Sequence, residues 1–521
     1  MKKRALLLSV WVLLIAVVLG ACQDDRQSDS SSTNTSSTNT PADSEPLQGG
    51  RLVYGMTQDL VSLDPHQSTD AGTRSVVFNL YEGLVKPTPT GELEPAVAES
   101  VDISDDAKTY TFTLRDGITF HDQTPVTVED IQYSIERYAE IQGESSAFFN
   151  RLEEVEIIDD RTVAVHLTEG DSEFLSELTL AIIPKDNEDP AGNPIGTGPY
   201  QFVSYTLGQN LELKRYEGYW KEDGAYLDEV QFKVIADVTT AMTELQAGTI
   251  DVLNYLTVDN VQTLQRAQGD AFTIVEGTMN LVHGLFLNHE YEPLQDVRVR
   301  QALCYAINRQ EINDFLFGGK SHLIGSHMIP GLTQWYEAEA ETLYEYNPET
   351  ARQLLAQAGY ADGFTLEITV PSSYSQHVNT AEIIANQLSQ VGITATIRQV
   401  EWATWLSEVY QGRQYQATVI GFDGTLAPSN WLDMYGSEAS NNMTNYADAE
   451  YDALLQEAMN TVDAEEKAAL YKRLQLHLAE NAVSVYIEDP ADYVALSSEF
   501  AGYEFYPTAA WDVSKIYRCA S

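Results

Sequence analysis

Two short strands flank a helix in the second half of the chain, and this order limits the folds that the chain can adopt. Residues 364–370 (FTLEITV) and 393–400 alternate between apolar and polar side chains, as half-buried strands do. The helix between them has apolar residues at spacings of three and four: Ala381, Ile384, Leu388 and Val391. Because two strands joined by a helical crossover pair in parallel, this stretch predicts an α/β domain with a parallel sheet.

The rest of the chain is apolar enough for a large globular body. It has 521 residues, of which 43% are hydrophobic, so two or three domains are expected. Further strands are predicted at 109–114, 161–167, 200–205, 210–215, 281–288 and 483–487. Helices are predicted after Thr127 and at 297–312, 448–460 and 464–480, with Thr127 and Asp296 as N-caps.

The N-terminus has the pattern of an export signal followed by a lipid-attachment site. A basic start at residues 2–4 precedes residues 5–18, which are apolar apart from one serine. This run is shorter than the ~20 residues of a membrane span but suits a signal peptide. It ends in Leu-Gly-Ala-Cys, which resembles the bacterial lipobox, so we predict a signal peptide over 1–21 and acylation of Cys22. A plain secretory signal with a chance cysteine and an N-terminal anchor helix are the alternatives.

Residues 22–48 are rich in Ser, Thr and Asn and almost free of apolar side chains. Such a segment cannot bury enough surface to offset its ordering entropy, so we expect a disordered tether. A diacylglycerol and an amide-linked acyl chain on Cys22 would supply the two lipid signals that stable anchoring needs. The protein is therefore expected outside the cytoplasm, anchored to the cell membrane.

The net charge argues against nucleic acid as a partner. The full chain carries a formal charge of −48, and removal of residues 1–21, which hold three basic and no acidic residues, would make it −51. No basic patch compensates, and such a surface repels phosphate backbones.

Two cysteines remain if Cys22 is acylated. Cys304 and Cys519 could form a disulfide in an exported protein, but Cys304 sits in an apolar helical pattern that is typical of a lone buried thiol. Both outcomes stay open.

Enzyme signatures are absent from the sequence. It contains no GxSxG, HExxH, phosphate-binding loop or GxGxxG motif, and its nine histidines are scattered. His322 and His327 are close in sequence, but nothing near them completes a set of metal ligands, so neither metal nor cofactor is expected. A hydrolase that uses two carboxylates remains an alternative, because 78 acidic residues include many chance pairs.

Aromatic and acidic side chains follow the predicted strands. Trp402 and Trp405 come just after the strand that ends at residue 400, and Asp423 opens a Gly- and Pro-containing loop after another apolar segment. Ligands of open α/β sheets bind beyond the carboxyl ends of strands, so Asp423 is a candidate ligand residue. The alternative is a turn aspartate that bonds its own backbone.

Six segments resemble one family, the family 5 extracellular solute-binding proteins, which serve ABC importers as oligopeptide, dipeptide and nickel receptors. The resemblance covers roughly residues 49–517. The segments are SLDPH at 62–66, residues 110–137, IGTGPY at 195–200, residues 296–309, residues 347–360 and residues 393–432.

This resemblance implies an α/β, two-lobed, type II periplasmic-binding-protein-like fold with an extra subdomain in the first lobe. By analogy, the first lobe is 49–280 plus 488–521, the extra subdomain lies near 85–190, and the second lobe is 281–487.

The resemblance also implies a ligand site. In peptide-binding members, an aspartate matching Asp423 pairs with the peptide's amine, and a tryptophan matching Trp402 lines the cleft. Residues matching Asp59, Val61 and Ser62 meet the peptide backbone. Dipeptide receptors carry an arginine in the loop that corresponds to residues 371–375, which here read PSSYS, so longer peptides are favoured.

The function expected from this resemblance is capture of extracellular peptides and their delivery to an ABC permease, by a lipid-anchored monomer without catalytic activity. A family 5 receptor for another solute, such as an oligosaccharide or a metal chelate, is the main alternative. Trp402, Trp405 and Trp431 could stack on sugars as well as line a peptide cleft.

Overall fold

The computed structural model describes residues 46–520, apart from 69, 144–146 and 222–223. The predicted signal peptide, Cys22 and nearly all of the predicted tether lie outside the described residues.

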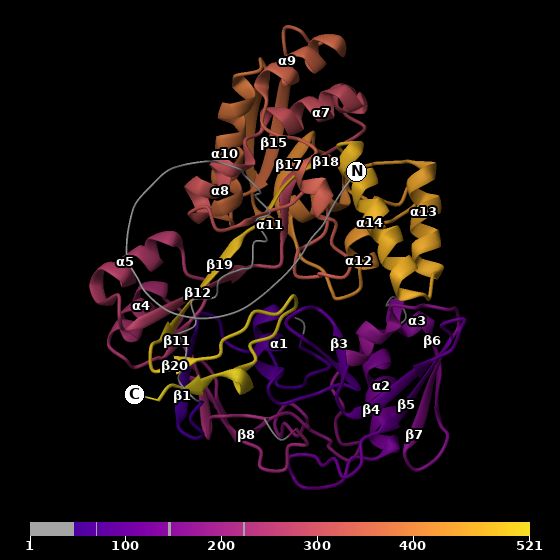
Figure 1. Ribbon diagram of the computed structural model, residues 1–521, viewed down its shortest axis with the longest axis vertical. Coiled ribbons are helices and arrows are strands. Elements are labelled where there is room, and N and C mark those ends of the chain that lie inside the picture. The colour runs from indigo at the N-terminus through magenta and orange to yellow at the C-terminus, as the bar shows by residue number, and fades with distance from the viewer. Residues whose placement is uncertain (1–45, 69, 144–146, 222–223, 521) are drawn as a thin grey trace, which may run out of the picture. The chain divides into compact units, whose positions relative to one another are not determined.

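A seven-stranded mixed sheet is built from both ends of the described chain (Figure 1). Its central strand β1 pairs in parallel with β10 and β11, and the outer pairs are antiparallel. In spatial order its strands are β12 (Phe272–Thr278), β19 (Ala491–Ser497), β11 (Val252–Leu253), β1 (Arg51–Met56), β10 (Glu229–Val234), β9 (Asn210–Arg215) and β8 (Tyr200–Thr206).

A six-stranded sheet is built from the middle of the chain. In spatial order its strands are β14 (His322–Leu323), β18 (Ser484–Asp489), β13 (Val282–Leu287), β17 (Ala417–Phe422), β15 (Thr365–Pro371) and β16 (Thr394–Val400). The predicted parallel unit is confirmed: β15 and β16 pair in parallel from Thr365↔Thr394 to Pro371↔Val400, and α10 (Ser375–Ser389) connects them.

Three smaller sheets complete the strands. They are β4 (Ala98–Ile103), β5 (Thr109–Leu114), β7 (Thr162–Leu167) and β6 (Leu152–Ile157) in one antiparallel sheet, and the pairs β2 (Val85–Pro87) with β3 (Leu93–Pro95) and β20 (Phe500–Ala501) with β21 (Tyr517–Arg518). The four-stranded sheet packs around the buried stripe of α2 (Val128–Gln142), which includes Ile131 and Ile135.

The remaining helices are α1 (Ala71–Val77), α3 (Ala147–Arg151), α4 (Val238–Gln246), α5 (Val258–Gln268), α6 (Glu292–Gln295), α7 (Val297–Ala306), α8 (Arg309–Phe317), α9 (Pro348–Gln357), α11 (Trp402–Thr404), α12 (Ser429–Leu432), α13 (Ala449–Asn460) and α14 (Ala464–Glu480). Short 3₁₀ or π turns are η1 (Phe174–Thr179), η2 (Ala338–Thr342), η3 (Trp405–Gln411), η4 (Asp433–Tyr435) and η5 (Val513–Lys515).

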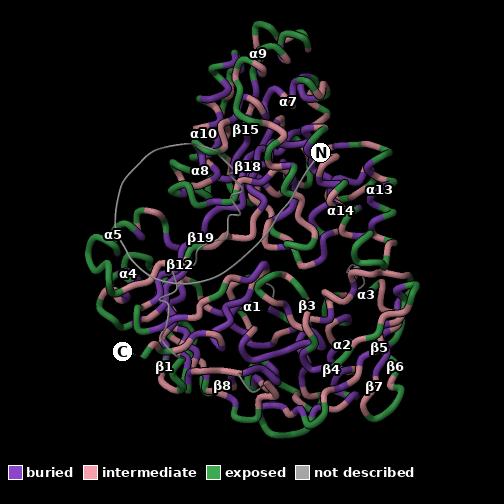
Figure 2. The backbone as a smooth tube through the Cα atoms, viewed as in Figure 1, coloured by how far each residue is buried: buried purple, intermediate pink, exposed green. Residues whose placement is uncertain are grey.

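The central strands β13 and β18 of the six-stranded sheet are buried at every residue, and the tube around the β18 label in Figure 2 is mostly purple. Val282 and Phe286 point into a core shared with α13 and α14, whereas Leu285 and Leu287 point into a second core shared with α7 and α10. Successive side chains of a strand face opposite sides, so one strand supplies both cores.

The prediction of one helix at 297–312 is wrong, because the helical conformation is interrupted after α7 and a second helix, α8, begins at Arg309. Asp296 caps α7 as predicted, since its side chain accepts a bond from the Arg298 N–H at 2.9 Å. Ile307 is extended, with ψ of 114°, and the Asn308 side chain accepts a bond from the Glu311 N–H at 3.2 Å to begin α8. A local N-cap therefore interrupts an apolar pattern that continues across it.

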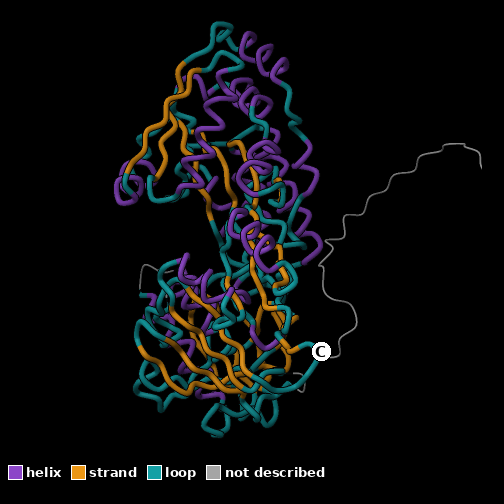
Figure 3. Tube along the Cα trace, turned by 90° about the vertical axis from the view of Figure 1, so that its left-hand side faces the viewer, coloured by secondary structure: helices purple, strands orange, loops and turns teal. Residues whose placement is uncertain are grey.

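The chain passes between the two large sheets at residues 279–281 and again at Pro490. The two crossings lie against each other: the Met279 N–H donates to the Pro490 carbonyl at 2.8 Å, and the Leu281 N–H donates to Asp489 Oδ1 at 3.0 Å. β12 and β19 pair from Phe272↔Ser497 to Thr278↔Ala491, up to these crossings. Figure 3 shows strands running between the lower and the upper part of the described chain.

Cys304 and Cys519 are both free, which decides the open question of their pairing. Within the described part of the chain, no helix combines the length and the apolar character that crossing a membrane requires.

Candidate functional site

Three parallel strands of the six-stranded sheet end at the same edge. β15 pairs in parallel with both β16 and β17, so their carboxyl ends share a side. Tyr374 follows β15, Trp402 follows β16 and Asp423 follows β17. This is the edge where open α/β sheets place ligands.

Trp402 and Tyr374 form an exposed aromatic pair at this edge. Trp402 is 37% exposed and Tyr374 is 44% exposed. Their rings meet edge to face with centroids 5.5 Å apart, and the other face of Trp402 stacks on Trp405 at 5.2 Å. An exposed indole braced from beneath is a suitable contact for an apolar or planar ligand group.

Asp423 is exposed directly beyond the last residue of β17. Within the described residues its carboxylate makes neither a hydrogen bond nor an ion pair, including to its own backbone. The turn-aspartate alternative requires such a backbone bond. Asp423 therefore retains its full capacity to accept bonds from a ligand.

The loop that carries Asp423 is held in place by the residues after it. The Trp431 indole N–H donates to the Thr425 carbonyl at 2.8 Å, and the Asn430 amide donates to Thr425 Oγ1 at 2.5 Å. A Cβ on Gly424 would lie 2.5 Å from the Trp431 ring, so only glycine allows this close packing.

Two of the tryptophans considered for sugar stacking are unavailable to a ligand. Trp405 and Trp431 are each only 1% exposed and belong to the same hydrophobic core. The Trp405 indole N–H also donates to Thr418 Oγ1 at 3.0 Å. The sequence pattern did not distinguish these buried rings from Trp402.

Asp59, Val61 and Ser62 lie in one loop after β1, and their polar groups mainly serve that loop. The Asp59 carboxylate accepts bonds from the Leu60 N–H, the Tyr205 hydroxyl and the Gly208 N–H, at 2.8, 2.8 and 2.5 Å. The Val61 N–H donates to Thr73 Oγ1 at 2.9 Å, and Ser62 Oγ accepts from the Asp64 N–H at 3.1 Å. The Val61 side chain points outward and is 68% exposed.

A cavity of about 370 Å³ lies beside the next part of this loop, within the size range of small-molecule sites. Its lining comes from the loop, from α1 and residues 78–87 after it, from α2, from η1 and the segment after it, and from Ala509. Lining residues include His66, Ser68, Phe78, Tyr138, Leu180 and Ala181. The lining thus combines parts of residues 65–87 with more distant segments, and Pro65 and His66 belong to the SLDPH segment at 62–66.

Buried polar groups shape this cavity. The Arg137 guanidinium pairs with Asp64 and lies 2.8 Å from His66 Nδ1, which fixes the loop. Burial lowers the pKa of His66 to about 4, so this ring is neutral at pH 7. Burial also raises the pKa of Glu177 above its usual value.

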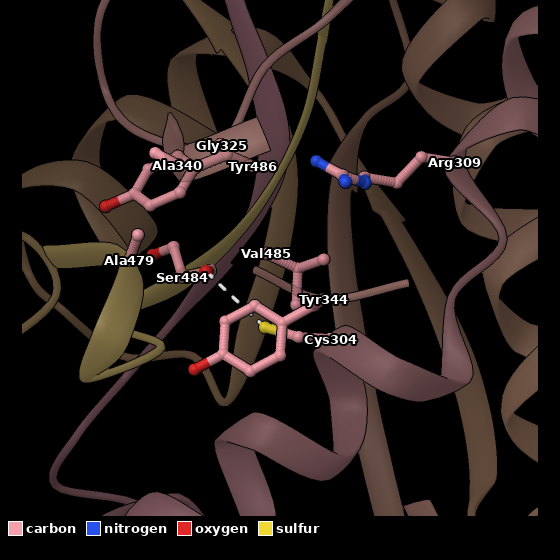
Figure 4. A pocket seen from close by; sticks show the side chains of 9 residues that line it. All are labelled: Cys304, Arg309, Gly325, Ala340, Tyr344, Ala479, Ser484, Val485 and Tyr486. Atoms are coloured by element: carbon pink, nitrogen blue, oxygen red, sulfur yellow. Dashed lines mark hydrogen bonds between the residues drawn. The ribbon is translucent and has the colours of Figure 1, made fainter. Parts of the chain in front are cut away.

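A second cavity is too small for a solute. It measures about 20 Å³, enough for a single water, and is lined by Cys304, Arg309 and Tyr344 among others (Figure 4). Burial raises the pKa of Cys304 to about 12, so its thiol is not reactive.

Metal ligands are not gathered anywhere in the described parts of the chain: no three His, Cys, Asp or Glu side chains could hold an ion. His322 lies 2.9 Å from a Glu341 oxygen, and His327 Nδ1 lies 2.6 Å from the Tyr435 hydroxyl.

Comparison with known proteins gives the family. The family model for bacterial extracellular solute-binding proteins, family 5, matches residues 92–443. Heme-binding protein A of Haemophilus influenzae is 30% identical over 478 residues, which cover 84% of this chain and 85% of that protein. Oligopeptide-binding protein AppA of Bacillus subtilis is 26% identical over 97% of both chains.

Solved structures agree with this result. The ABC transporter substrate-binding protein CtaP of Listeria monocytogenes is 27% identical, with a TM-score of 0.81 over 90% of this chain and 99% of that one. AppA in complex with a nonapeptide has a TM-score of 0.69 and 25% identity over 91% of this chain and 100% of that one. The predicted α/β, two-lobed periplasmic-binding-protein fold is thereby confirmed. The chain belongs to family 5 of the bacterial extracellular solute-binding proteins.

Proposed function

We propose that this chain is the receptor of an ABC importer that binds peptides by their free amine and delivers them to a permease. Family 5 proteins bind solutes rather than catalyse reactions, and the peptide is the specific part of this proposal. The observation that supports it best is Asp423, an exposed and unpaired carboxylate on a braced loop, on the same sheet edge as Tyr374 and Trp402.

Asp423 has the chemistry to bind a peptide ammonium group. A charge-assisted bond of this kind is roughly twice as strong as a neutral hydrogen bond. Trp402 and Tyr374 would contact neighbouring side chains of the peptide. An extended peptide can also add to backbone groups as a strand does, which gives affinity largely independent of its sequence.

Longer peptides are favoured over dipeptides. Residues 371–375 contain no arginine that could bind the carboxylate of a short ligand. The relative AppA was solved with a nonapeptide. The cavity of about 370 Å³ beside residues 65–68 would accept side chains of varied size, with water filling the remaining space.

We further propose that ligand binding closes two lobes, 49–280 plus 488–521 and 281–487, about the crossings at 279–281 and Pro490. Closure of this kind is a hinge motion, in which a few residues absorb the change. Lipid attached at Cys22 and the tether at 22–48 would keep the monomeric receptor near its permease.

A calorimetric double-mutant cycle tests the amine contact. First, mass spectrometry of the native protein identifies the co-purified peptide, which is then synthesised with a free and with an acetylated amine. Asp423→Ala should weaken the free-amine form by ~2–5 kcal/mol, or about one and a half to three and a half decades. The acetylated form should bind the wild type poorly and lose little more from the substitution.

The control is Asp362→Ala, an exposed aspartate in the loop before β15. A coupling energy near zero between Asp423 and the amine would refute the proposed anchor.

A non-peptide solute is the second candidate, because the relative from Haemophilus influenzae is a heme-binding protein. The exposed Trp402 could stack on such a planar ligand. A thermal-shift screen of peptides, haem and oligosaccharides separates the two candidates.

A further inference from the structure

The Glu173 carboxylate, just before η1, gathers donors from distant parts of the chain. Its Oε2 atom accepts bonds from the Ser429 N–H at 3.0 Å and the Ser429 hydroxyl at 2.6 Å. Its Oε1 atom lies 3.0 Å from Lys467 Nζ and also accepts a bond from the Tyr471 hydroxyl. Glu173 thus meets the first residue of α12 and two residues of α14.

This contact is buried. The side chains of Glu173 and Lys467 are only 7% and 3% exposed. Burying a charge is costly unless it is paired and hydrogen-bonded, and removing one partner leaves the other unsatisfied. Because both carboxylate oxygens are fully used, the four bonds are expected to act as one unit.

The contact joins parts of the chain that belong to different sheets. Glu173 follows β7 of the four-stranded sheet, whereas α12 and α14 pack with the six-stranded sheet. Ser429 is 256 residues away in the chain and Tyr471 is 298 residues away. In Figure 1, α3 beside this turn lies just below the lower ends of α13 and α14, and the Ser172 hydroxyl bonds the Thr461 carbonyl directly after α13.

Glu173 is presented by a rigid turn. Its N–H donates to Asp171 Oδ1 at 3.0 Å, and Asp171 pairs with Arg151 at the end of α3. Ser172 adds a further link, since its hydroxyl donates to the Thr461 carbonyl at 2.8 Å. The turn therefore holds the carboxylate at a fixed place.

Ser429 connects this contact with the candidate ligand site. It directly follows the loop at 423–428, and the residues after it, Asn430 and Trp431, brace that loop through Thr425. Asn430 and Trp431 directly follow Ser429, so a contact that holds Ser429 also holds the backbone from which these two side chains reach Thr425.

We propose that Glu173 is a positioning residue of the ligand site: through Ser429 it holds the loop that carries Asp423, from outside the sheet that bears this loop. The role in ligand binding rests on the proposed function of Asp423. Glu173 itself need not touch the ligand.

Glu173 belongs to the proposed lobe 49–280 and Ser429 to the proposed lobe 281–487, so their contact is expected in the closed, ligand-bound protein. Hydrogen–deuterium exchange of the protein saturated with its co-purified ligand therefore tests the positioning role, whatever the chemistry of that ligand. Glu173→Gln keeps the shape but removes the charge that pairs with Lys467. Amides of residues 424–431 should exchange about tenfold faster, which corresponds to ~1.4 kcal/mol of local stability. Ser429→Ala removes only the hydroxyl bond and should give a smaller increase in the same segment.

The matched control is Glu169→Gln, an exposed glutamate in the same connection, which should leave this segment unchanged. Unchanged exchange at 424–431 in Glu173→Gln would overturn the proposal. An equal increase of the exchange rate throughout the six-stranded sheet would also overturn the proposal, because it would indicate a general loss of stability and not a local one.

Binding measurements then relate the two residues. Tetra-alanine is the probe. Glu173→Gln should weaken its binding about tenfold when Asp423 is present, and much less when it is combined with Asp423→Ala. An equal loss in both backgrounds would overturn the proposed action through Asp423. If Asp423→Ala leaves the preference for a free amine intact, the proposed function fails, while the exchange result still decides the positioning role.

Discussion

Replacing Glu488 by glutamine should stabilise the protein at alkaline pH. Glu488 is the second-last residue of β18, beside the crossing at Pro490. It is fully buried, and neither of its carboxylate oxygens has a hydrogen-bond partner in the described structure. The Nδ1 atom of His283 lies 3.5 Å from Glu488 Oε1 and is also without a hydrogen-bond partner in the described structure. Burial raises the pKa of Glu488 to about 8 and lowers the pKa of His283 to about 4. Both groups are therefore neutral at pH 7.

The sign of the effect follows from the raised pKa. An unfolded glutamate loses its proton near its usual pKa of 4.5, whereas the folded protein keeps this proton up to about pH 8. The stability that the proton provides is fully present below pH 4.5 and is lost as the pH rises to about 8. At ~1.4 kcal/mol for each pKa unit, the shift from 4.5 to about 8 corresponds to a loss on the order of 5 kcal/mol. Glutamine cannot ionise, so the variant should escape this loss.

Urea unfolding at intervals from pH 5 to pH 9 measures the difference between wild type and Glu488→Gln. The free energy of unfolding of the variant minus that of the wild type should increase with pH up to about pH 8 and stay constant above it. Glu382→Gln, an exposed position on α10, is the control and should give a difference that does not depend on pH.

The opposite sign would refute this reasoning. If Glu488 and His283 form a charged pair in the folded protein, glutamine would destabilise the protein at pH 7. A variant that is less stable than the wild type there would show that the 3.5 Å contact outweighs burial.

Three further outcomes are expected. Cys22→Ala should release the protein from the membrane, or leave it unprocessed, while ligand binding persists; cell fractionation and N-terminal mass spectrometry check this. Trp405→Ala should cost ~3–5 kcal/mol of stability in urea unfolding because its ring is buried, whereas Trp402→Ala should cost much less and mainly weaken ligand binding in calorimetry. Peptide at a hundredfold excess over its Kd should stabilise the protein by ~2.7 kcal/mol in thermal melts, and it should reduce the radius of gyration in solution scattering; an unchanged radius would contradict closure.

Local patterns predicted the elements whose signals are contained in a few residues. The strands and helix of residues 364–400 were recognised because alternation and helical spacing follow directly from backbone geometry. The break between α7 and α8 was missed because the apolar spacing continues through Ile307, while a single side-chain bond from Asn308 decides where the new helix begins.

Burial of individual aromatic rings could not be predicted in the same way. Trp402 and Trp405 are three residues apart and both follow the same strand, yet one is 37% exposed and the other 1%. The difference arises from packing against β17, where Thr418 accepts the Trp405 indole bond. Contacts between distant residues, such as that of Glu173 with Ser429, leave no local pattern at all.

The two acidic residues that the resemblance placed at the ligand site can now be distinguished by their hydrogen bonds. The Asp59 carboxylate accepts three bonds from its own protein, so its oxygens are largely occupied in holding its loop against the β8–β9 hairpin. Asp423 accepts none within the described structure, although the loop that carries it is fixed at Thr425 by Asn430 and Trp431. A ligand group that meets a fixed carboxylate loses little free energy in ordering it, which is the condition for a strong contact. This difference is why we propose Asp423, and not Asp59, for the amine contact, whereas Asp59 supports the loop that exposes Val61.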